Sequence, residues 1–220
     1  MKNYLALMEN PLFSGINEDE IKKLCECLKV RERRIKKGSF VFRTGDRVSK
    51  VYLILSGSMH IVDEDFWGNR TIIEGLSAHT LFGEAYALSE AKRYLVGVIA
   101  AENSVILQVD PVKLYKTCLN ACPCHSIVIK NTLYILSEKL VRLTGKLEHI
   151  VKRSIREKIL SYLSTCAKKA GTASFCIPYS RQQLADYLCV ERSALSHELS
   201  KLKDLGMIKY RKNYFELLEM

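Results

Sequence analysis

The feature that most constrains the fold is a run of apolar residues that recur at alternating steps of four and three. The run comprises Ile129, Leu133, Leu136, Leu140, Leu143, Leu147 and Ile150. Residues at this spacing share one face of an α-helix, and a repeat sustained over several heptads is typical of a coiled-coil seam. We therefore expect a helix across residues 121–150 whose apolar stripe forms the interface of a homodimer. The alternative is a long helix that packs against the chain's own preceding domain.

The region before this helix is rich in short β-strands. Between residues 30 and 109, runs of apolar and β-branched residues alternate with glycines that mark turns. Many short strands divided by turn residues predict a closed or double-sheet β-structure. We assign residues 1–120 to this domain.

The stretch from residue 180 to residue 206 has the pattern of a helix-turn-helix. Ser180 precedes Gln183 by three residues, which is the spacing of a capping box at a helix start. A tight turn and a second helix with an apolar face follow, and residues 209–217 then alternate like the hairpin of a winged motif. We expect a winged helix-turn-helix domain across residues 151–220. The alternative is two surface helices with ordinary polar faces.

The positive charge of the chain is concentrated in this last domain. Residues 151–220 hold 13 Lys and Arg against 7 Asp and Glu, whereas the first 150 residues hold 21 against 17. A small basic domain after a nearly balanced one is typical of phosphate binding, so we predict double-stranded DNA as the partner. Arg181 is expected to contact a phosphate and Arg192 a guanine. The full set of predicted DNA contacts is Ser180, Arg181, Arg192, Ser193, Ser196 and His197.

The composition is that of a soluble globular protein, with 48% hydrophobic and 26% charged residues. The first ten residues lack a long apolar run, and no apolar stretch approaches the ~20 residues of a membrane span. We expect a cytoplasmic protein that has no membrane partner. The eight cysteines are then expected to be thiols or ligands rather than disulfides.

Three cysteines stand together just before the long helix: Cys118, Cys122 and Cys124. They are the candidates for a metal site or a thiol-based redox response. The single residue between the last two gives poorer chelating geometry than the spacing of metal knuckles, and a buried cysteine generally acts as a small hydrophobe. We expect no bound metal, and the sequence identifies no cofactor.

The order of a β-roll, a long dimer helix and a winged helix-turn-helix resembles that of the CRP/FNR family of bacterial transcription regulators. Gly45-Asp46 and residues 52–58 resemble the early strands of the family's roll, and Phe82-Gly83-Glu84 followed by Arg93 resembles its phosphate-binding cassette. Residues 180–182 and 191–193 resemble its DNA-binding helices. The resemblance implies an α+β fold: an N-terminal double-stranded β-helix (a jelly roll like that of cyclic-nucleotide-binding domains), a dimerisation helix and a C-terminal winged helix-turn-helix.

The resemblance also implies an effector site at Gly83, Glu84, Arg93 and Tyr94. Gly83 would let a backbone amide approach a phosphate, Glu84 would accept from a ribose hydroxyl and Arg93 would pair with the phosphate. Cyclic-nucleotide binders of the family follow that arginine with small residues, whereas Tyr94 and Leu95 follow it here. A phenol and an isobutyl group in that tight space would fill it or repel the phosphate, so we expect the roll to sense a different small molecule or a redox state. The alternative for Glu84 and Arg93 is an ion pair that holds the roll together.

These expectations describe a homodimeric, non-enzymatic transcription regulator that binds a palindromic operator, with RNA polymerase as a candidate protein partner. One alternative is a thiol oxidoreductase, and another is a nucleotide-binding module that regulates a partner protein. The sequence has no Cys-x-x-Cys, P-loop, Gly-x-Ser-x-Gly or His-Glu-x-x-His motif. The basic C-terminal domain disfavours the second alternative.

Overall fold

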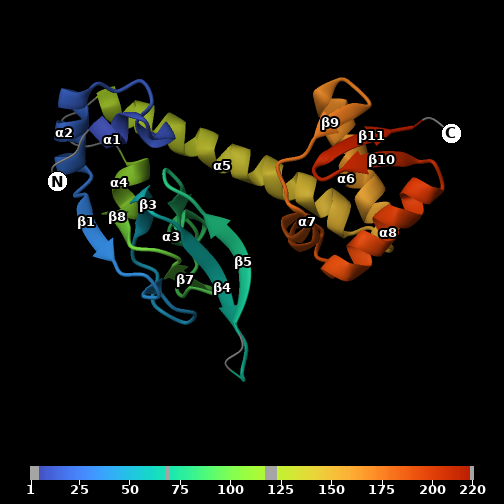
Figure 1. Ribbon diagram of the computed structural model, residues 1–220. Coiled ribbons are helices and arrows are strands. Elements are labelled where there is room, and N and C mark those ends of the chain that lie inside the picture. The colour runs from blue at the N-terminus through green and yellow to red at the C-terminus, as the bar shows by residue number, and fades with distance from the viewer. Residues whose placement is uncertain (1–4, 68–69, 117–122, 219–220) are drawn as a thin grey trace. The chain divides into compact units, whose positions relative to one another are not determined.

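A computed structural model describes residues 5–67, 70–116 and 123–218 (Figure 1). The chain forms two compact units, residues 1–136 and residues 137–220. The long helix α5 (Pro123–Ile150) contributes its first half to one unit and its second half to the other. The boundaries that we predict at residues 120 and 150 instead treat this helix as a segment of its own.

The first unit is built around two four-stranded antiparallel sheets (Figure 1). One sheet has the order β1 (Arg31–Ile35), β8 (Ser104–Val109), β3 (Val51–Ser56) and β6 (Leu81–Phe82). The other has the order β2 (Phe40–Phe42), β7 (Gly97–Ala100), β4 (Met59–Glu64) and β5 (Arg70–Leu76). Strands that pair are mostly distant in sequence, as in a jelly roll. The predicted double-sheet structure is confirmed.

The strand alternation of β3 and β8 creates two separate cores. Leu53 pairs with Leu107, and Ile54 pairs with Ile106. Since successive side chains of a strand point to opposite faces, the two leucines pack against helices while the two isoleucines pack between the sheets. The helical side comprises α1 (Leu5–Met8), the 3-10 helix η1 (Pro11–Phe13), α2 (Glu18–Cys27), α4 (Pro111–Tyr115) and the start of α5.

The helix α5 buries one face of its first turns in the helical core of the first unit. Cys124 and Val128 are buried in the helical core, and Ile127 and Ile135 are partly buried there. The heptad positions lie on a different face. Four of them are more than half exposed: Leu133 60%, Leu140 65%, Leu143 57% and Leu147 53%. Packing against the chain's own domain, the alternative that we considered, therefore accounts for the first turns of the helix but not for its apolar stripe.

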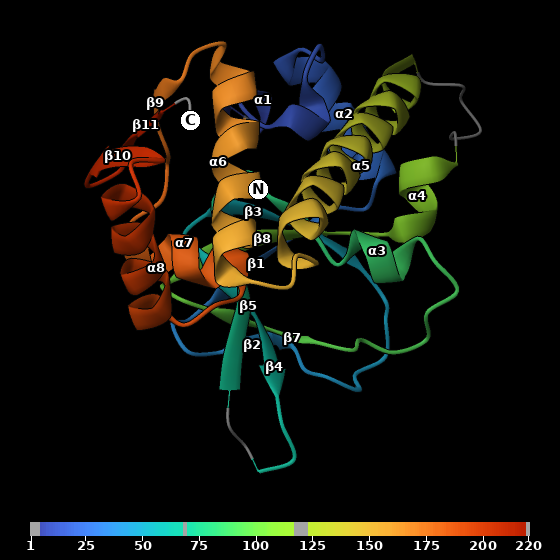
Figure 2. The ribbon, with the colours of Figure 1, turned by 90° about the vertical axis from the view of Figure 1, so that its right-hand side faces the viewer.

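The second unit is a winged helix-turn-helix (Figure 2). Its elements are α6 (Ile155–Ala170), β9 (Ser174–Cys176), α7 (Arg181–Leu188), α8 (Arg192–Asp204), β10 (Ile208–Arg211) and β11 (Tyr214–Leu217). The strands form an antiparallel sheet in the order β10-β11-β9. Leu184, Leu195 and Leu199 are buried in one core with residues of α6 and of the sheet. The predicted fold of this domain is confirmed. Among the described residues, no helix is long and apolar enough to cross a membrane.

We expect Gly57→Ala to destabilise the roll. Gly57 has a φ of +86°, and an added Cβ would lie 2.8 Å from Cα of Ser104, which is closer than real Cβ contacts. The left-handed backbone alone makes the substitution unfavourable by about 1–3 kcal/mol in the free energy of unfolding. Urea unfolding followed by circular dichroism measures the loss.

The matched control is Gly145→Ala in α5, where nothing lies within 4 Å of the added Cβ. There the same substitution should stabilise the helix by up to ~1 kcal/mol. Equal effects of the two substitutions would contradict the backbone assignment at Gly57.

Candidate functional site

The predicted capping box at the start of α7 is present. The Ser180 hydroxyl accepts a hydrogen bond from the Gln183 amide at 3.3 Å, and the Gln183 side chain accepts from the Ser180 amide at 2.8 Å. The Ser180 hydroxyl therefore already has a partner that holds the N-terminus of this helix in place.

The turn between α7 and α8 contains a strained residue. Cys189 has a φ of +52°, in the left-handed region that favours glycine. The amide of Val190 donates to the Ala185 carbonyl at 3.0 Å and closes the turn. Glu191 then caps α8, because its carboxylate accepts from the amides of Ser193 and Ala194 at 2.9 and 3.3 Å.

The predicted contact residues of α8 share its outward face. Arg192, Ser193 and His197 are exposed, and Ser196 is half-buried. The opposite face carries Leu195, Leu199 and Leu202, all fully buried in the core. The Ser193 hydroxyl donates to the Glu191 carboxylate, and this bond lowers the pKa of Glu191. In the part of the chain that the structure describes, Arg192 and His197 make no hydrogen bond or ion pair. They are therefore the side chains of this face that are available to a ligand.

Arg181 makes a contact that sequence reasoning did not anticipate. Its guanidinium lies over the rings of Tyr210 and Phe215, 5.1 and 5.7 Å from their centroids. It also donates to the Lys212 carbonyl at 3.3 Å. Partial burial lowers the pKa of Arg181. Arg181 thus connects the start of α7 to the β10–β11 hairpin, whose tip carries the exposed Arg211 and Lys212.

The sequence also did not predict the ion pair between α6 and α8. The Arg156 Nε lies 2.8 Å from the Glu198 carboxylate, and this bond lowers the pKa of Glu198. The two residues are 42 positions apart in sequence, so no local pattern indicates that they meet. The pair fixes the side of α8 that faces α6 and leaves Arg192 and His197 on the outer side.

The cradle between the two sheets is filled by aromatic side chains. Tyr94 is 1% exposed, and its ring stacks on Phe42 with the centroids 3.7 Å apart. Its hydroxyl donates to the Lys50 carbonyl at 3.2 Å, and burial raises the pKa of Tyr94. The Tyr94 ring therefore belongs to the core between the sheets. The expectation that Leu95 fills the same space is wrong, because its side chain is 73% exposed.

The other predicted effector residues surround this filled cradle. Gly83 has a φ of +76° and precedes the short helix α3 (Glu84–Ala87), in which Glu84 is buried. An added Cβ at Gly83 would lie 3.1 Å from the Tyr52 ring, so the ring already occupies the space beside the glycine. The Arg93 guanidinium donates to the Gly45 carbonyl at 2.6 Å. Gly83 thus keeps a left-handed backbone, and the Tyr52 ring lies beside it.

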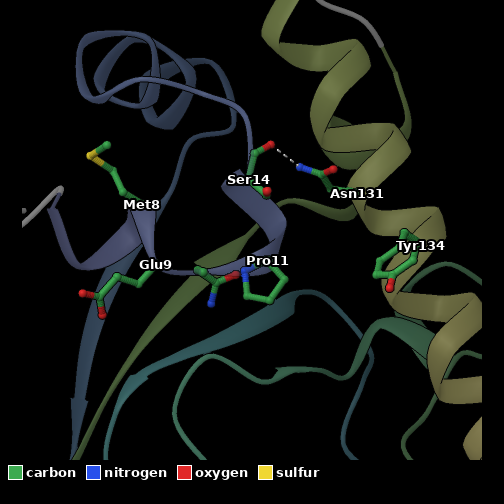
Figure 3. A pocket seen from close by; sticks show the side chains of 7 residues that line it. Met8, Glu9, Pro11, Ser14, Asn131 and Tyr134 are labelled. Carbon is green, nitrogen blue, oxygen red and sulfur yellow. Dashed lines mark hydrogen bonds between the residues drawn. The ribbon is translucent and has the colours of Figure 1, made fainter.

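A cavity lies outside the cradle, where the N-terminal segment meets α5 (Figure 3). Its volume is about 340 Å³. It is lined by Met8, Glu9, Asn10, Pro11, Ser14, Asn131 and Tyr134. The Asn131 side chain bridges the two segments, since it donates to the carbonyls of Leu12 and Ser14 at 3.0 and 2.9 Å.

The cysteine candidates show no metal site within the described residues. Cys118 and Cys122 lie outside those residues, and Cys124 is buried among apolar side chains. No group of three or more His, Cys, Asp or Glu side chains that could hold a metal ion occurs in the described ranges.

Comparison with known proteins assigns both units to recognised families. Residues 32–120 match the family described as Cyclic nucleotide-binding domain, and residues 157–220 match the family described as Crp-like helix-turn-helix domain. An anaerobic regulatory protein of Bacillus subtilis is 21% identical over 211 residues, which are 94% of this chain and 86% of that protein.

Two solved structures share the fold over nearly the whole chain. The c-di-GMP responsive global regulator CLP of Xanthomonas campestris has a TM-score of 0.59 at 20% identity, covering 93% of this chain and 100% of that one. The catabolite activator protein of Thermus thermophilus has a TM-score of 0.50 at 20% identity, covering 96% and 94%.

We expect the purified protein not to bind cyclic AMP or cyclic GMP at micromolar concentration. The ring of Tyr94 occupies the cradle and is held there by Phe42 and by the Lys50 carbonyl. Isothermal titration calorimetry with each nucleotide measures the binding. A dissociation constant in the micromolar range would mean that Tyr94 leaves the core, and would contradict this assignment.

Proposed function

Since this chain belongs to the CRP/FNR family of transcription regulators, we propose that it binds a palindromic operator as a homodimer. The single observation that carries the proposal is the exposed apolar stripe of α5, which includes Leu133, Leu140 and Leu147. A continuous apolar stripe on the surface of a helix is typical of an interaction surface. A second copy of the same helix supplies a partner surface with matching heptads.

We propose that α8 enters the major groove of DNA. The exposed Arg192 and His197 lie near its N-terminus, the region that reads base edges in helix-turn-helix proteins. Arg192 is suited to a bidentate contact with guanine. Ser193 and Ser196 are the adjacent polar positions. Ser180 and Arg181 belong to the start of α7 beside the groove, where a backbone phosphate lies within reach in this class of complex.

We propose that the effector is not a cyclic nucleotide. The proposal is supported by the aromatic packing in the core between the sheets, where the Tyr94 ring stacks on Phe42. The roll then responds to another small molecule or to a redox change, and its rim includes Gly83, Glu84 and Arg93. The cavity beside Asn131 and Tyr134 is an alternative place for such a molecule.

A DNA-bound dimer of this kind acts in the cytoplasm, with RNA polymerase as its candidate protein partner. Two of the described cysteines are poorly suited to thiol chemistry. Burial raises the pKa of Cys25 to about 12 and raises the pKa of Cys166 as well, and a thiol that stays protonated at neutral pH is a poor nucleophile. The role proposed for this chain is that of a regulator rather than of a thiol oxidoreductase.

The double substitution Leu140→Lys and Leu147→Lys should convert the dimer to a monomer. Both side chains are more than half exposed in the single chain, so the charges leave its own core intact but become buried if two helices pair, which is strongly unfavourable. Sedimentation velocity measures the association state. Val141→Lys is the matched control, because Val141 is 66% exposed but lies off the heptad stripe. A dimer that survives the double substitution would exclude this interface.

Arg192→Ala should weaken binding to the operator by ~1–3 kcal/mol and relax the preference at one base pair in each half-site. Arg181→Ala should weaken binding to all DNA alike and reduce the salt dependence by about 1 per half-site. The measurement is titration of each variant against the selected operator and a scrambled duplex at several salt concentrations. Equal losses on both duplexes for Arg192→Ala would place that side chain on the backbone rather than on a base.

A further inference from the structure

His149 is buried at the end of a helix whose neighbouring positions are exposed. It is 2% exposed, whereas Leu147 is 53% exposed. Its Nδ1 lies 2.9 Å from the Ser161 hydroxyl, which belongs to α6. A polar side chain buried in this way is stabilised only where it has a hydrogen-bond partner, and Ser161 supplies one from the next helix.

The His149 ring lies beside two tyrosines that pack with a third; we call these three the tyrosine cluster: Tyr162, Tyr179 and Tyr187. The His149 ring meets Tyr162 edge-on with the centroids 5.6 Å apart, and it lies 6.3 Å from Tyr187. Tyr187 stacks on Tyr179 at 5.1 Å. Since Tyr162 belongs to α6 and Tyr187 to α7, one residue at the end of α5 contacts both helices. Figure 2 shows α6 beside the last turns of α5.

The surroundings of the His149 ring favour its uncharged form. Burial lowers the pKa of His149, and the nearby Lys169 and Lys152 lower this pKa further, whereas Glu148 opposes the shift. The Lys146 ammonium lies 5.6 Å from the Tyr187 ring centroid. A neutral imidazole that shares a hydrogen bond with Ser161 and packs edge-on against a phenol is therefore the form that the packing favours.

We propose that His149 is a positioning residue that sets the separation of the two DNA-reading helices in the dimer. The proposal rests on the function proposed above. In the proposed dimer, the paired heptad stripes hold the two α5 helices in place relative to each other. The position of each α8 then depends on how the rest of the second unit packs against the end of α5. The second compact unit begins at Ser137 and includes the last turns of α5. His149 and the tyrosine cluster provide a packed, hydrogen-bonded attachment at this point.

The consequence concerns the spacing of half-sites in the operator. A dimer whose two DNA-binding units are rigidly attached to α5 binds half-sites only at one separation, about 10 base pairs or a multiple of it. Each inserted base pair moves the half-sites apart by about 3.4 Å and also rotates one against the other. When the attachment is loosened, the dimer tolerates the wrong spacing better and binds the correct spacing less tightly.

The experiment first selects the operator of the full-length protein from a random duplex pool. Failure to enrich a palindrome would overturn the proposed function itself. The wild type, His149→Ala and the control His60→Ala are then titrated against the operator and against versions with one base pair inserted or deleted between the half-sites. His60 lies on β4, in the other compact unit. Circular dichroism and sedimentation confirm that each variant is folded and dimeric.

We expect the wild type and His60→Ala to lose at least about tenfold in affinity on the altered spacings, and His149→Ala to lose less than about threefold. The affinity of His149→Ala for the correct spacing should fall by about tenfold. His149→Asn, which places an amide near the position of Nδ1, should restore part of the spacing preference. A general loss of stability would lower binding to every duplex alike and leave the spacing preference unchanged.

Ser161→Ala removes the hydrogen-bond partner and leaves the His149 ring in place, so it provides the test if His149→Ala does not fold. The inference is overturned if folded His149→Ala or Ser161→Ala keeps the wild-type spacing preference. It is also overturned if the wild type binds a palindrome but shows no preference among the spacings.

Discussion

The pairing of β3 with β8 is the interaction on which the first unit depends. Alternation along these two strands divides their side chains between a core under the helices, with Leu53 and Leu107, and a core between the sheets, with Ile54 and Ile106. A shift of one residue in this register would exchange the two sets and disrupt both cores. The same register presents Tyr52 to the inner core, where its ring takes the space beside Gly83.

Features encoded by short-range patterns could be predicted from the sequence. The capping box at Ser180 depends on residues three apart, and the exposed stripe of α5 follows from helical periodicity alone. The β-roll was predictable as a class because its turns are marked by glycine, although the strand order was not. Tyr94 and Leu95 were expected to share one environment, whereas Tyr94 is buried and Leu95 is exposed.

Features that depend on distant partners could not be predicted. Arg181 has the same sequence signature whether it is exposed to solvent or stacked on Tyr210, and only the fold brings the hairpin to it. The Arg156–Glu198 ion pair joins two helices. Its residues are 42 positions apart in sequence, so no local sequence pattern predicts that they meet. Leu95 was misplaced because its direction depends on the local path of the chain after Tyr94. The burial of His149 could not be predicted either, because only the fold brings the tyrosines next to it.

If α5 pairs as proposed, its exposed stripe makes the amount of active protein depend on the concentration of the chain. Two chains must then associate before both reading helices are present in one molecule. Below the dissociation constant of the dimer, a twofold rise in the amount of chain therefore raises the amount of dimer about fourfold. The rate at which the chain is synthesised then controls the amount of dimer directly. It acts together with any effector, because a ligand that favours the dimer lowers the copy number at which the operator becomes occupied.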